Sequence, residues 1–355
     1  MVLSRYQHLR FIIAIILLVI SQRFKFLPAS VLLLPLDKTT TLKCIREIMK
    51  ILYSLFPLFI FFVVACTSSL PKQTTEQEQV TKNAEVLRAS VLQNVSFAQV
   101  MALDVAPNAS EKIAYGSNVL QYGQLYLPQN LRGKGIESTA PLVVFVHGGC
   151  WLNAFSVDHS EAFSQALTKE GYAVWSIEYR RTGDDGGGWP GSLNDVLKGV
   201  SFVQTFKDYP IDLSKVILAG HSAGGHLALL ASAPERQVFK GGAKLKGVIG
   251  LAAIVDVVRY SQGNNSCQTA TPAFFGGSAE QKPEAYALGS PDHHVLKEHS
   301  LLLQGSADAI VEQSQALKSG FEYQIVEGAG HFDWIHPETN AYQAFLSALK
   351  QRVSE

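Results

Sequence analysis

The chain has 355 residues, which is long enough for one large α/β domain or two ordinary ones with a sizeable buried core. Basic and acidic residues each number 30, so the formal net charge is zero, and no long basic run is interleaved with aromatic residues. This balance argues against nucleic acid as a partner.

Two nearly apolar runs, residues 11–20 and 51–65, lie near the N-terminus. Their apolar residues raise the mean hydropathy of the whole chain to +0.11. The second follows Met49 and Lys50, is shorter than the ~20 residues that a membrane span needs, and is typical of a signal-peptide core. It ends in Val-Val-Ala before Cys66, which resembles a bacterial lipoprotein signal whose cysteine is lipidated. We therefore expect Met49 to be the true initiator. The alternative is a hydrophobic anchor made of two short apolar segments.

The stretch after Cys66 is rich in Thr, Gln, Lys and Glu and poor in large apolar residues, as in a flexible tether. We expect residues 1–65 to be an upstream segment with a signal peptide, residues 66–84 a tether, and residues 85–355 a single catalytic domain. Thr67 follows the cysteine where aspartate would signal inner-membrane retention. By resemblance to that sorting rule, we expect a protein anchored through lipid in the bacterial envelope, at the outer membrane and facing the periplasm or the surface.

From about residue 111 onward, short runs typical of strands alternate with segments of helical spacing. The expected strands are residues 119–127, 142–148, 172–180, 215–221, 246–254, 300–305 and 322–328, and the expected helices are 160–171, 192–206 and 312–320, with two more beginning near 223 and 339. This alternation predicts the α/β class, with a mostly parallel sheet covered by helices on both faces. Reactive residues should then follow the carboxyl ends of the strands.

Ser222 lies in the motif Gly-His-Ser-Ala-Gly, between an apolar strand and a predicted helix. A nucleophile on a sharp strand-to-helix turn needs small neighbours so that its hydroxyl stands clear of the sheet. A pattern of this kind also arises by chance, but its placement directly after a buried strand favours a nucleophilic serine.

A serine hydroxyl needs a base to take its proton, and the base needs a carboxylate to orient it. Asp308 follows the strand at 300–305, and His331 follows the next one. Ser222, Asp308 and His331 thus occur in the order that α/β-hydrolases use. Asp256 is a reserve acid or a structural cap, and His336 is a rival base in the same loop. The pair at 293 and 294 precedes the acid and fits the order badly.

The segment "VFVHGGCW", after an earlier strand, is a candidate source of donors for a developing oxyanion, and the alternative is a glycine turn without such a role. Glycines let the backbone approach a substrate and point its amides inward. We expect these donors to be the amides of Gly149, Cys150 and Ala223. No H-E-x-x-H or paired C-x-x-C motif occurs, which argues against a metal site.

Several further segments are open to two interpretations. Trp151, Trp189 and Trp334 are candidate aromatic contacts in the substrate pocket, although Trp189 could equally hold its Gly-rich loop to the core. The two arginines at 180 and 181 could attract an acidic substrate or form structural ion pairs with Glu178 or Asp184. Residues 80–104 show helical spacing and could cap the site as a small lid.

Taken together, "HGGCW", "EYRR", "GGGWPGSLNDV", "GHSAGGHLALL" and "GAGHFDWIHP" resemble α/β-hydrolase esterases of the acetyl and feruloyl esterase type, with kynurenine formamidase and hormone-sensitive lipase as relatives. The resemblance covers about residues 111–350. It implies the triad Ser222, Asp308 and His331 and a serine esterase or amidase without a metal or cofactor. Cys150 stands where the lipase relatives have a third glycine and matches the formamidase-like form. The choice between ester and formamide substrates stays open.

After processing at Cys66, Cys150 and Cys267 are the remaining cysteines, an even number in an oxidising compartment. One hypothesis is a disulfide that ties the predicted oxyanion loop ("HGGCW", residues 147–151) to the "NNSCQ" segment. The other is two separate thiols.

The function predicted from these features is hydrolysis of small carboxylic esters through a Ser-His-Asp acyl-enzyme mechanism. Arylformamidase and peptidase activities are alternatives, and so is a non-catalytic binding protein on the same fold. The expected partners are a small ester or formamide and, through the lipid anchor, a membrane.

Overall fold

The computed structural model describes residues 92–107, 109–133, 137–239, 242–291 and 299–355, which all belong to one compact unit running from Glu85 to Glu355. Met49, Cys66, the two apolar runs and the polar tether lie outside the described residues. Within the described part of the chain, no helix is both long and apolar enough to cross a membrane.

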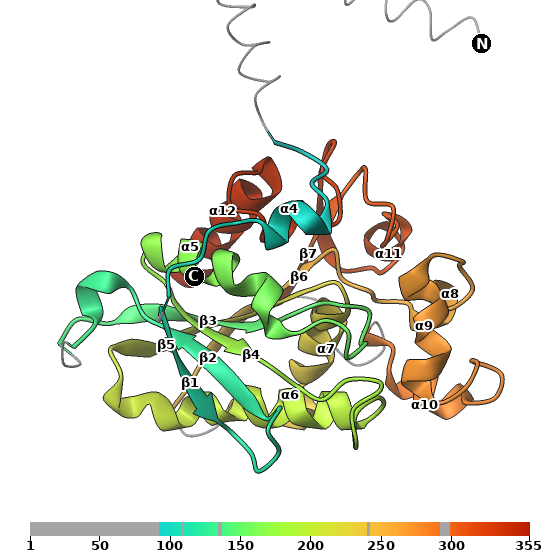
Figure 1. Ribbon diagram of the computed structural model, residues 1–355, viewed down its shortest axis with the longest axis horizontal. Coiled ribbons are helices and arrows are strands. Elements are labelled where there is room, and N and C mark those ends of the chain that lie inside the picture. The colour runs from blue at the N-terminus through green and yellow to red at the C-terminus, as the bar shows by residue number, and fades with distance from the viewer. Residues whose placement is uncertain (1–91, 108, 134–136, 240–241, 292–298) are drawn as a thin grey trace, which may run out of the picture. The chain divides into compact units, whose positions relative to one another are not determined.

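The described residues build an eight-stranded sheet in the order β1-β2-β4-β3-β5-β6-β7-β8 (Figure 1). Its first two pairings, β1 with β2 and β2 with β4, are antiparallel and the others are parallel, which confirms the predicted α/β class. The strands are β1 (Ser110–Ala114), β2 (Tyr122–Tyr126), β3 (Ala140–Val146), β4 (Ala173–Ile177), β5 (Ile211–His221), β6 (Leu245–Leu251), β7 (Ser300–Gly305) and β8 (Glu322–Val326).

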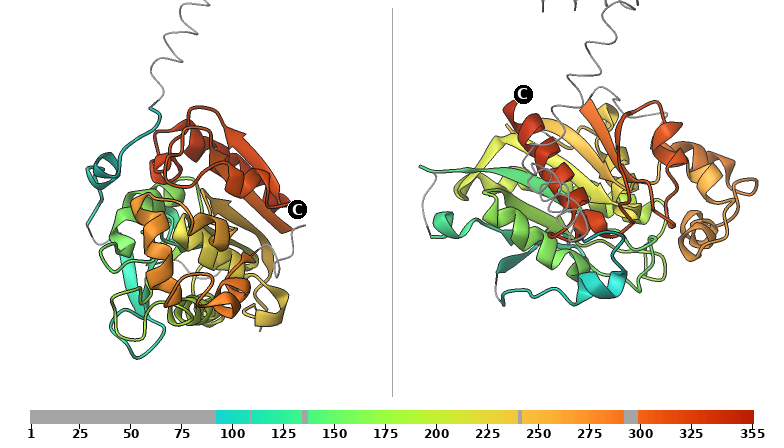
Figure 2. Two further views of the ribbon diagram at one scale, coloured as in Figure 1. Left: turned by 90° about the vertical axis from the view of Figure 1, so that its right-hand side faces the viewer. Right: turned by 90° about the horizontal axis from the view of Figure 1, so that it is seen from above.

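Helices cover both faces of the sheet, with α5 and α12 above it and α6 below it in Figure 1. Figure 2 shows α12 lying across one face in the view from above. The α-helices are α4 (Phe97–Met101), α5 (Glu161–Lys169), α6 (Gly191–Ser201), α7 (Ala223–Ala231), α8 (Val257–Tyr260), α9 (Ser266–Phe275), α10 (Pro283–Leu288), α11 (Ser314–Leu317) and α12 (Asn340–Ser354). Short 3-10 helices are η2 (Gln129–Leu131), η3 (Val157–Ser160), η4 (Phe202–Asp208), η5 (Pro234–Arg236) and η8 (Asp333–Ile335).

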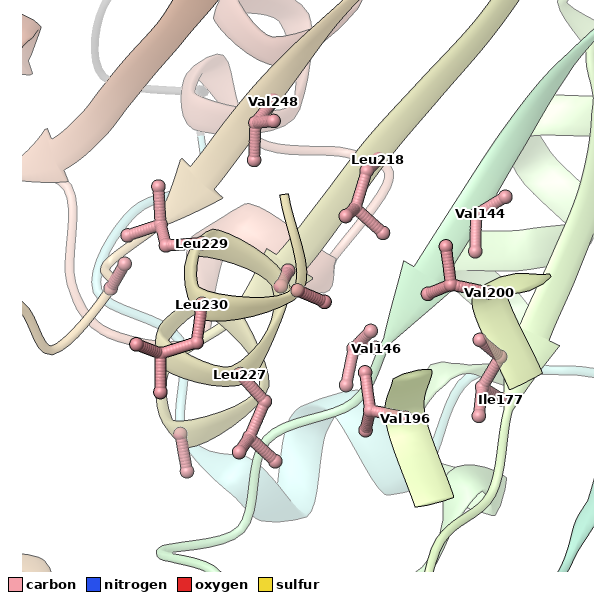
Figure 3. Packing of buried hydrophobic residues seen from close by; sticks show 14 of the residues in the cluster. Val144, Val146, Ile177, Val196, Val200, Leu218, Leu227, Leu229, Leu230 and Val248 are labelled. Atoms are coloured by element: carbon pink, nitrogen blue, oxygen red, sulfur yellow. The ribbon is translucent and has the colours of Figure 1, made fainter. Parts of the chain in front are cut away.

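Two hydrophobic cores form because successive strand residues point to opposite faces of the sheet. In β3, Val144 and Val146 belong to the core against α6 and α7, whereas Val143 and Phe145 belong to the core against α5 and α12. Figure 3 shows the first of these cores, with strand and helix side chains interdigitating. Burial on both faces explains why this strand is a continuous apolar run.

The structure differs from the predicted elements mainly between β6 and β7. There α8, α9 and α10 occupy a stretch for which no helix was predicted, although Asn265 and Gln268 form a capping box at the start of α9 that is a sequence signature. Pro272 inside α9 obscures the helical pattern. Of the lid expected at 80–104, the described part contains one short helix, α4.

Candidate active site

Ser222 lies at the turn between β5 and α7, with φ 55° and ψ −122°. This backbone conformation is unfavourable for a residue with a side chain, and such strain is found at nucleophiles held on a strand-to-helix turn. The Ser222 amide donates to the Leu251 carbonyl at 2.8 Å, which ties the turn to β6. A Cβ on Gly224 would come within 2.2 Å of the carbonyls of Val146 and His147, so only glycine fits where α7 starts against β3.

Asp308 and His331 form a buried pair at the ends of β7 and β8. The His331 Nδ1–H donates to Asp308 Oδ2 at 2.8 Å, which leaves Nε2 as the nitrogen that can accept a proton. The other carboxylate oxygen, Oδ1, accepts the amides of Ile310 and Val311, both at 2.8 Å. The Asp308 carboxylate is therefore held by its own loop while it binds the imidazole.

His221, the residue before Ser222, links the nucleophile turn to the His331 loop. Its Nε2 lies 2.8 Å from the His331 carbonyl, and the two imidazole centroids are 4.7 Å apart. Burial holds the pKa of His221 well below its ordinary value, so the ring is neutral and donates Nε2–H to that carbonyl. Among the described residues, the Ser222 hydroxyl has no hydrogen-bond partner. Contacts between a nucleophile and its base often tighten only when substrate binds.

The loop after β3 lies directly over the nucleophile turn. A Cβ on Gly148 would lie 3.1 Å from Ser222 Cβ and 2.9 Å from the His221 carbonyl. Gly149, Cys150 and Trp151 then follow with φ values of 110°, 54° and 58°. Ala223 is the first residue of α7, so its amide has no partner within the helix. The loop and the helix start thus bring backbone amides next to the serine.

A buried network of charged side chains holds the loop after β3 in place. Glu178 Oε1 accepts from His147 Nε2 at 3.0 Å, and its Oε2 accepts the Val157 amide at 3.0 Å. Arg181 lies 3.1 Å from the same carboxylate and also donates to the Phe155 carbonyl. Burial alone would raise the pKa of Glu178, but His147, Arg181 and the Val157 amide outweigh it and hold that pKa below the usual value.

The predicted arginine ion pairs are therefore only partly as expected. Arg181 pairs with Glu178 and Asp184, whereas Arg180 binds Asp195 at 2.7 Å, a residue that the sequence did not suggest. Arg181 joins the loops that follow β3 and β4, and Arg180 fastens the second of these loops to α6.

A disulfide joins Cys150 to Cys267 at the start of α9, across 117 residues and with the Cα atoms 4.9 Å apart. Next to it, Trp151 Nε1 donates to His226 Nδ1 at 3.2 Å, and His226 Nε2 bonds to the Gly289 carbonyl at 2.7 Å. The strained loop is thus fastened to α9, to α7 and to the end of α10.

Two of the three predicted pocket tryptophans lie in the cores. Trp151 stacks on Phe274, and Trp334 belongs to the core on the α12 side; neither has any exposed surface, so we assign neither to a substrate contact. Trp189 is half-buried, and its ring packs against Phe275 at 5.4 Å. Its amide also donates to the Phe274 carbonyl, so this residue holds its loop to α9.

The rival acid and base have other partners. Asp256 caps α8, where its side chain accepts the Arg259 amide at 2.9 Å. His336 is buried, and its Nδ1 accepts the Glu338 amide at 3.3 Å. The histidines at 293 and 294 lie outside the described residues. No group of three metal-binding side chains comes together in the described ranges.

Sequence reasoning missed His147 and His221, which position the site, and proposed Glu178 only as a partner of the arginines. Each carries a recognisable signal, because a charged or imidazole side chain at the end of an apolar strand is costly unless it is hydrogen-bonded.

The sequence profile of the BD-FAE family matches residues 124–320, more than half of the chain. Esterase LipC of Mycobacterium tuberculosis is 24% identical over 266 residues, which are 67% of this chain and 64% of LipC. Kynurenine formamidase of Danio rerio is 27% identical over 147 residues, which are 41% of this chain and 46% of that protein. The chain therefore spans less than two thirds of the length of these curated relatives.

Among solved structures, Esterase B from Lactobacillus rhamnosis has a TM-score of 0.59 at 20% identity, covering 78% of this chain and 93% of the esterase. Another structure of that esterase, inhibited with a tributyrin phosphonate, has a TM-score of 0.54 at 18% identity and covers 80% of this chain and 97% of that one. At these identities the likeness shows the fold, an α/β-hydrolase-type arrangement.

Proposed function

Because this chain belongs to the BD-FAE family, we propose that it is a serine hydrolase that cleaves small carboxylic esters through an acyl-enzyme on Ser222. The single observation that carries the proposal is the buried Asp308–His331 pair beside a serine in a strained turn. LipC, named an esterase, and the esterase inhibited with a tributyrin phosphonate favour an ester of modest size.

In the proposed reaction, His331 Nε2 takes the Ser222 proton while Oγ bonds to the ester carbonyl carbon. The carbonyl oxygen becomes an oxyanion that accepts hydrogen bonds from the amides of Gly149, Cys150 and Ala223. The histidine then gives its proton to the departing alkoxide, which leaves as the alcohol. Water attacks the acyl-enzyme by the same two proton transfers and releases the acid.

Hydrolysis of an aryl formamide is the second candidate. The kynurenine formamidase relative and the Gly-Gly-Cys-Trp form of the oxyanion loop favour it. The same residues would act, with an arylamine as the leaving group. Rates on acetyl, butyryl, feruloyl and N-formyl aryl substrates separate the two candidates.

A fluorophosphonate probe tests the enzyme proposal directly. We expect it to label wild-type protein at Ser222 and to leave Ser222→Ala unlabelled. Turnover of every substrate in the panel should fall with labelling. Failure of the probe to label a folded protein would support a non-catalytic binding role instead.

We also propose that the protein works at a bacterial envelope membrane, held by lipid on Cys66, because Val-Val-Ala before this cysteine follows an apolar run. Cys66→Ser should leave the protein unlipidated by mass spectrometry and should leave the ester hydrolysis of the folded domain unchanged. An unmodified cysteine in protein isolated from envelopes would contradict the anchor.

A further inference from the structure

Residues 92–101 lie before the matched part of the family and are fastened to the loop that carries His331. The amides of Asn94 and Val95 each donate to the Asp333 carboxylate at 2.7 Å. The same carboxylate accepts the Gly330 amide at 3.0 Å and is almost fully buried. One acidic side chain, two residues beyond the proposed base, therefore holds both segments together.

Short-range features then fix the direction of α4. Ser96 caps the helix and forms a capping box with Gln99, while Val95 and Val100 are buried in the core against α5 and α12. Phe97 is the first residue of this helix and stays half-buried.

Phe97 contacts two further phenylalanines that come from opposite sides of the site. Its ring centroid lies 5.5 Å from that of Phe332 and 5.5 Å from that of Phe155. Phe332 is in turn 5.1 Å from the His331 ring, in an edge-on arrangement. Phe155 flanks the oxyanion loop, because a Cβ on Gly149 would lie 2.4 Å from its own Cβ. All three phenylalanines are half-buried, so part of each side chain remains exposed.

We infer that Phe97, Phe155 and Phe332 form an aromatic wall of the substrate site, and that Phe97 is a specificity-determining residue supplied by the N-terminal segment. This inference rests on the proposed function. The wall extends from the proposed oxyanion donors to the proposed base, so an ester bound between them lies beside it. Exposed aromatic surface stabilises a bound apolar group in proportion to the apolar area that is buried. It therefore contributes much less binding free energy for a methyl group than for a larger one. The wall therefore selects esters that carry an apolar group larger than methyl.

Two substrate series test this selection and locate the group. In one, the acyl chain lengthens from acetyl to butyryl to octanoyl on a fixed p-nitrophenol. In the other, acetate is fixed and the alcohol is methyl, butyl or phenyl. Phe97→Ala should lower kcat/KM for the larger members about tenfold relative to the smallest member, and Phe97→Leu should lower it less. An effect confined to one series assigns the wall to the acyl or to the alcohol group.

Met101→Ala is the matched control, because this side chain is on the same helix and is 52% exposed. It should leave both profiles unchanged. A Phe97→Ala profile parallel to the wild type, with equal loss for all members or with no loss, overturns the inference. If wild-type Ser222 also fails to react with a fluorophosphonate, the proposed function itself has failed. If it reacts and turns esters over, only the role of Phe97 is lost.

Discussion

At Ser222 the backbone adopts a conformation that residues with side chains avoid, and the surroundings over-determine it. The serine amide is bound to β6, and His221 is bound to the loop of the proposed base. These contacts therefore hold the Ser222 hydroxyl at the end of β5, next to the two elements that the proposed chemistry needs.

Replacement of single residues of the proposed triad should cost most of the turnover. Ser222→Ala and His331→Ala should each lower kcat about a millionfold, because members of a triad act as a unit. Asp308→Asn should cost about ten-thousandfold, since the amide favours the wrong imidazole tautomer. Steady-state rates on a p-nitrophenyl ester measure all three.

His336→Ala is the control for the base, because this histidine is bound to the backbone of its own loop. It should keep most of the activity. An inactive His336→Ala beside an active His331→Ala would mean that the base has been assigned to the wrong histidine.

His226 makes stability depend on pH. Burial lowers its pKa to about 4, whereas an unfolded histidine has a pKa of ~6.5. The unfolded state therefore binds more protons, so stability falls as the pH drops from about 6.5 to about 4. Protonation at Nδ1 would also place a proton against the Trp151 N–H.

His226→Gln removes this titration and keeps a donor and an acceptor. We expect its Tm to fall less than that of the wild type between pH 7 and pH 4, even if it starts lower. The remaining slope reports the other groups whose pKa is lowered in the fold, among them Glu178 and His159, whose pKa burial lowers to about 3. Parallel Tm curves for variant and wild type would rule His226 out as a source of the acid sensitivity.

At the scale of elements, the oxyanion loop depends on neighbours that are distant in the sequence. Glu178 at the end of β4 holds it from one side, and α9 holds it from the other through the Cys150–Cys267 disulfide. Three successive residues with positive φ would relax if these neighbours were lost.

Reduction of the disulfide should therefore loosen the loop. A bridge that closes a loop of this length stabilises a fold by about 5 kcal/mol in the chain-entropy account. Dithiothreitol should lower Tm, and it should lower kcat more than it changes KM because the loop amides are the proposed donors to the oxyanion.

The double variant Cys150→Ala/Cys267→Ala controls for other effects of the reductant. Its Tm and kcat should not respond to dithiothreitol and should match those of the reduced wild type. A reduced wild-type protein with unchanged kcat would show that the loop keeps its conformation without the bridge.

At the scale of the molecule, the sheet separates two hydrophobic cores, and the proposed site lies at the carboxyl ends of its parallel strands. The loops that follow β3, β5, β7 and β8 all start at the carboxyl ends of parallel strands, so the proposed oxyanion loop, nucleophile, acid and base meet there. The segment ahead of β1 joins them through Asp333.

The sequence by itself determined the α/β class and the positions of seven of the strands, because strands buried on both faces are apolar runs. It also placed Ser222, Asp308 and His331 just after strand ends, since the turn and the loops have local signatures. The helices α8 to α10 were not predicted because α8 and α10 are short and the proline inside α9 obscures its helical pattern.

Only the tertiary structure decided which residues meet. Asp308 rather than Asp256 faces His331, and Asn94 meets Asp333 across 239 residues. Burial of Trp151 and Trp334, which removed them from the expected pocket, was likewise not visible in the sequence. Periodicity reports whether a residue is buried but not against what, because the partner depends on how the strand order folds distant loops onto one another.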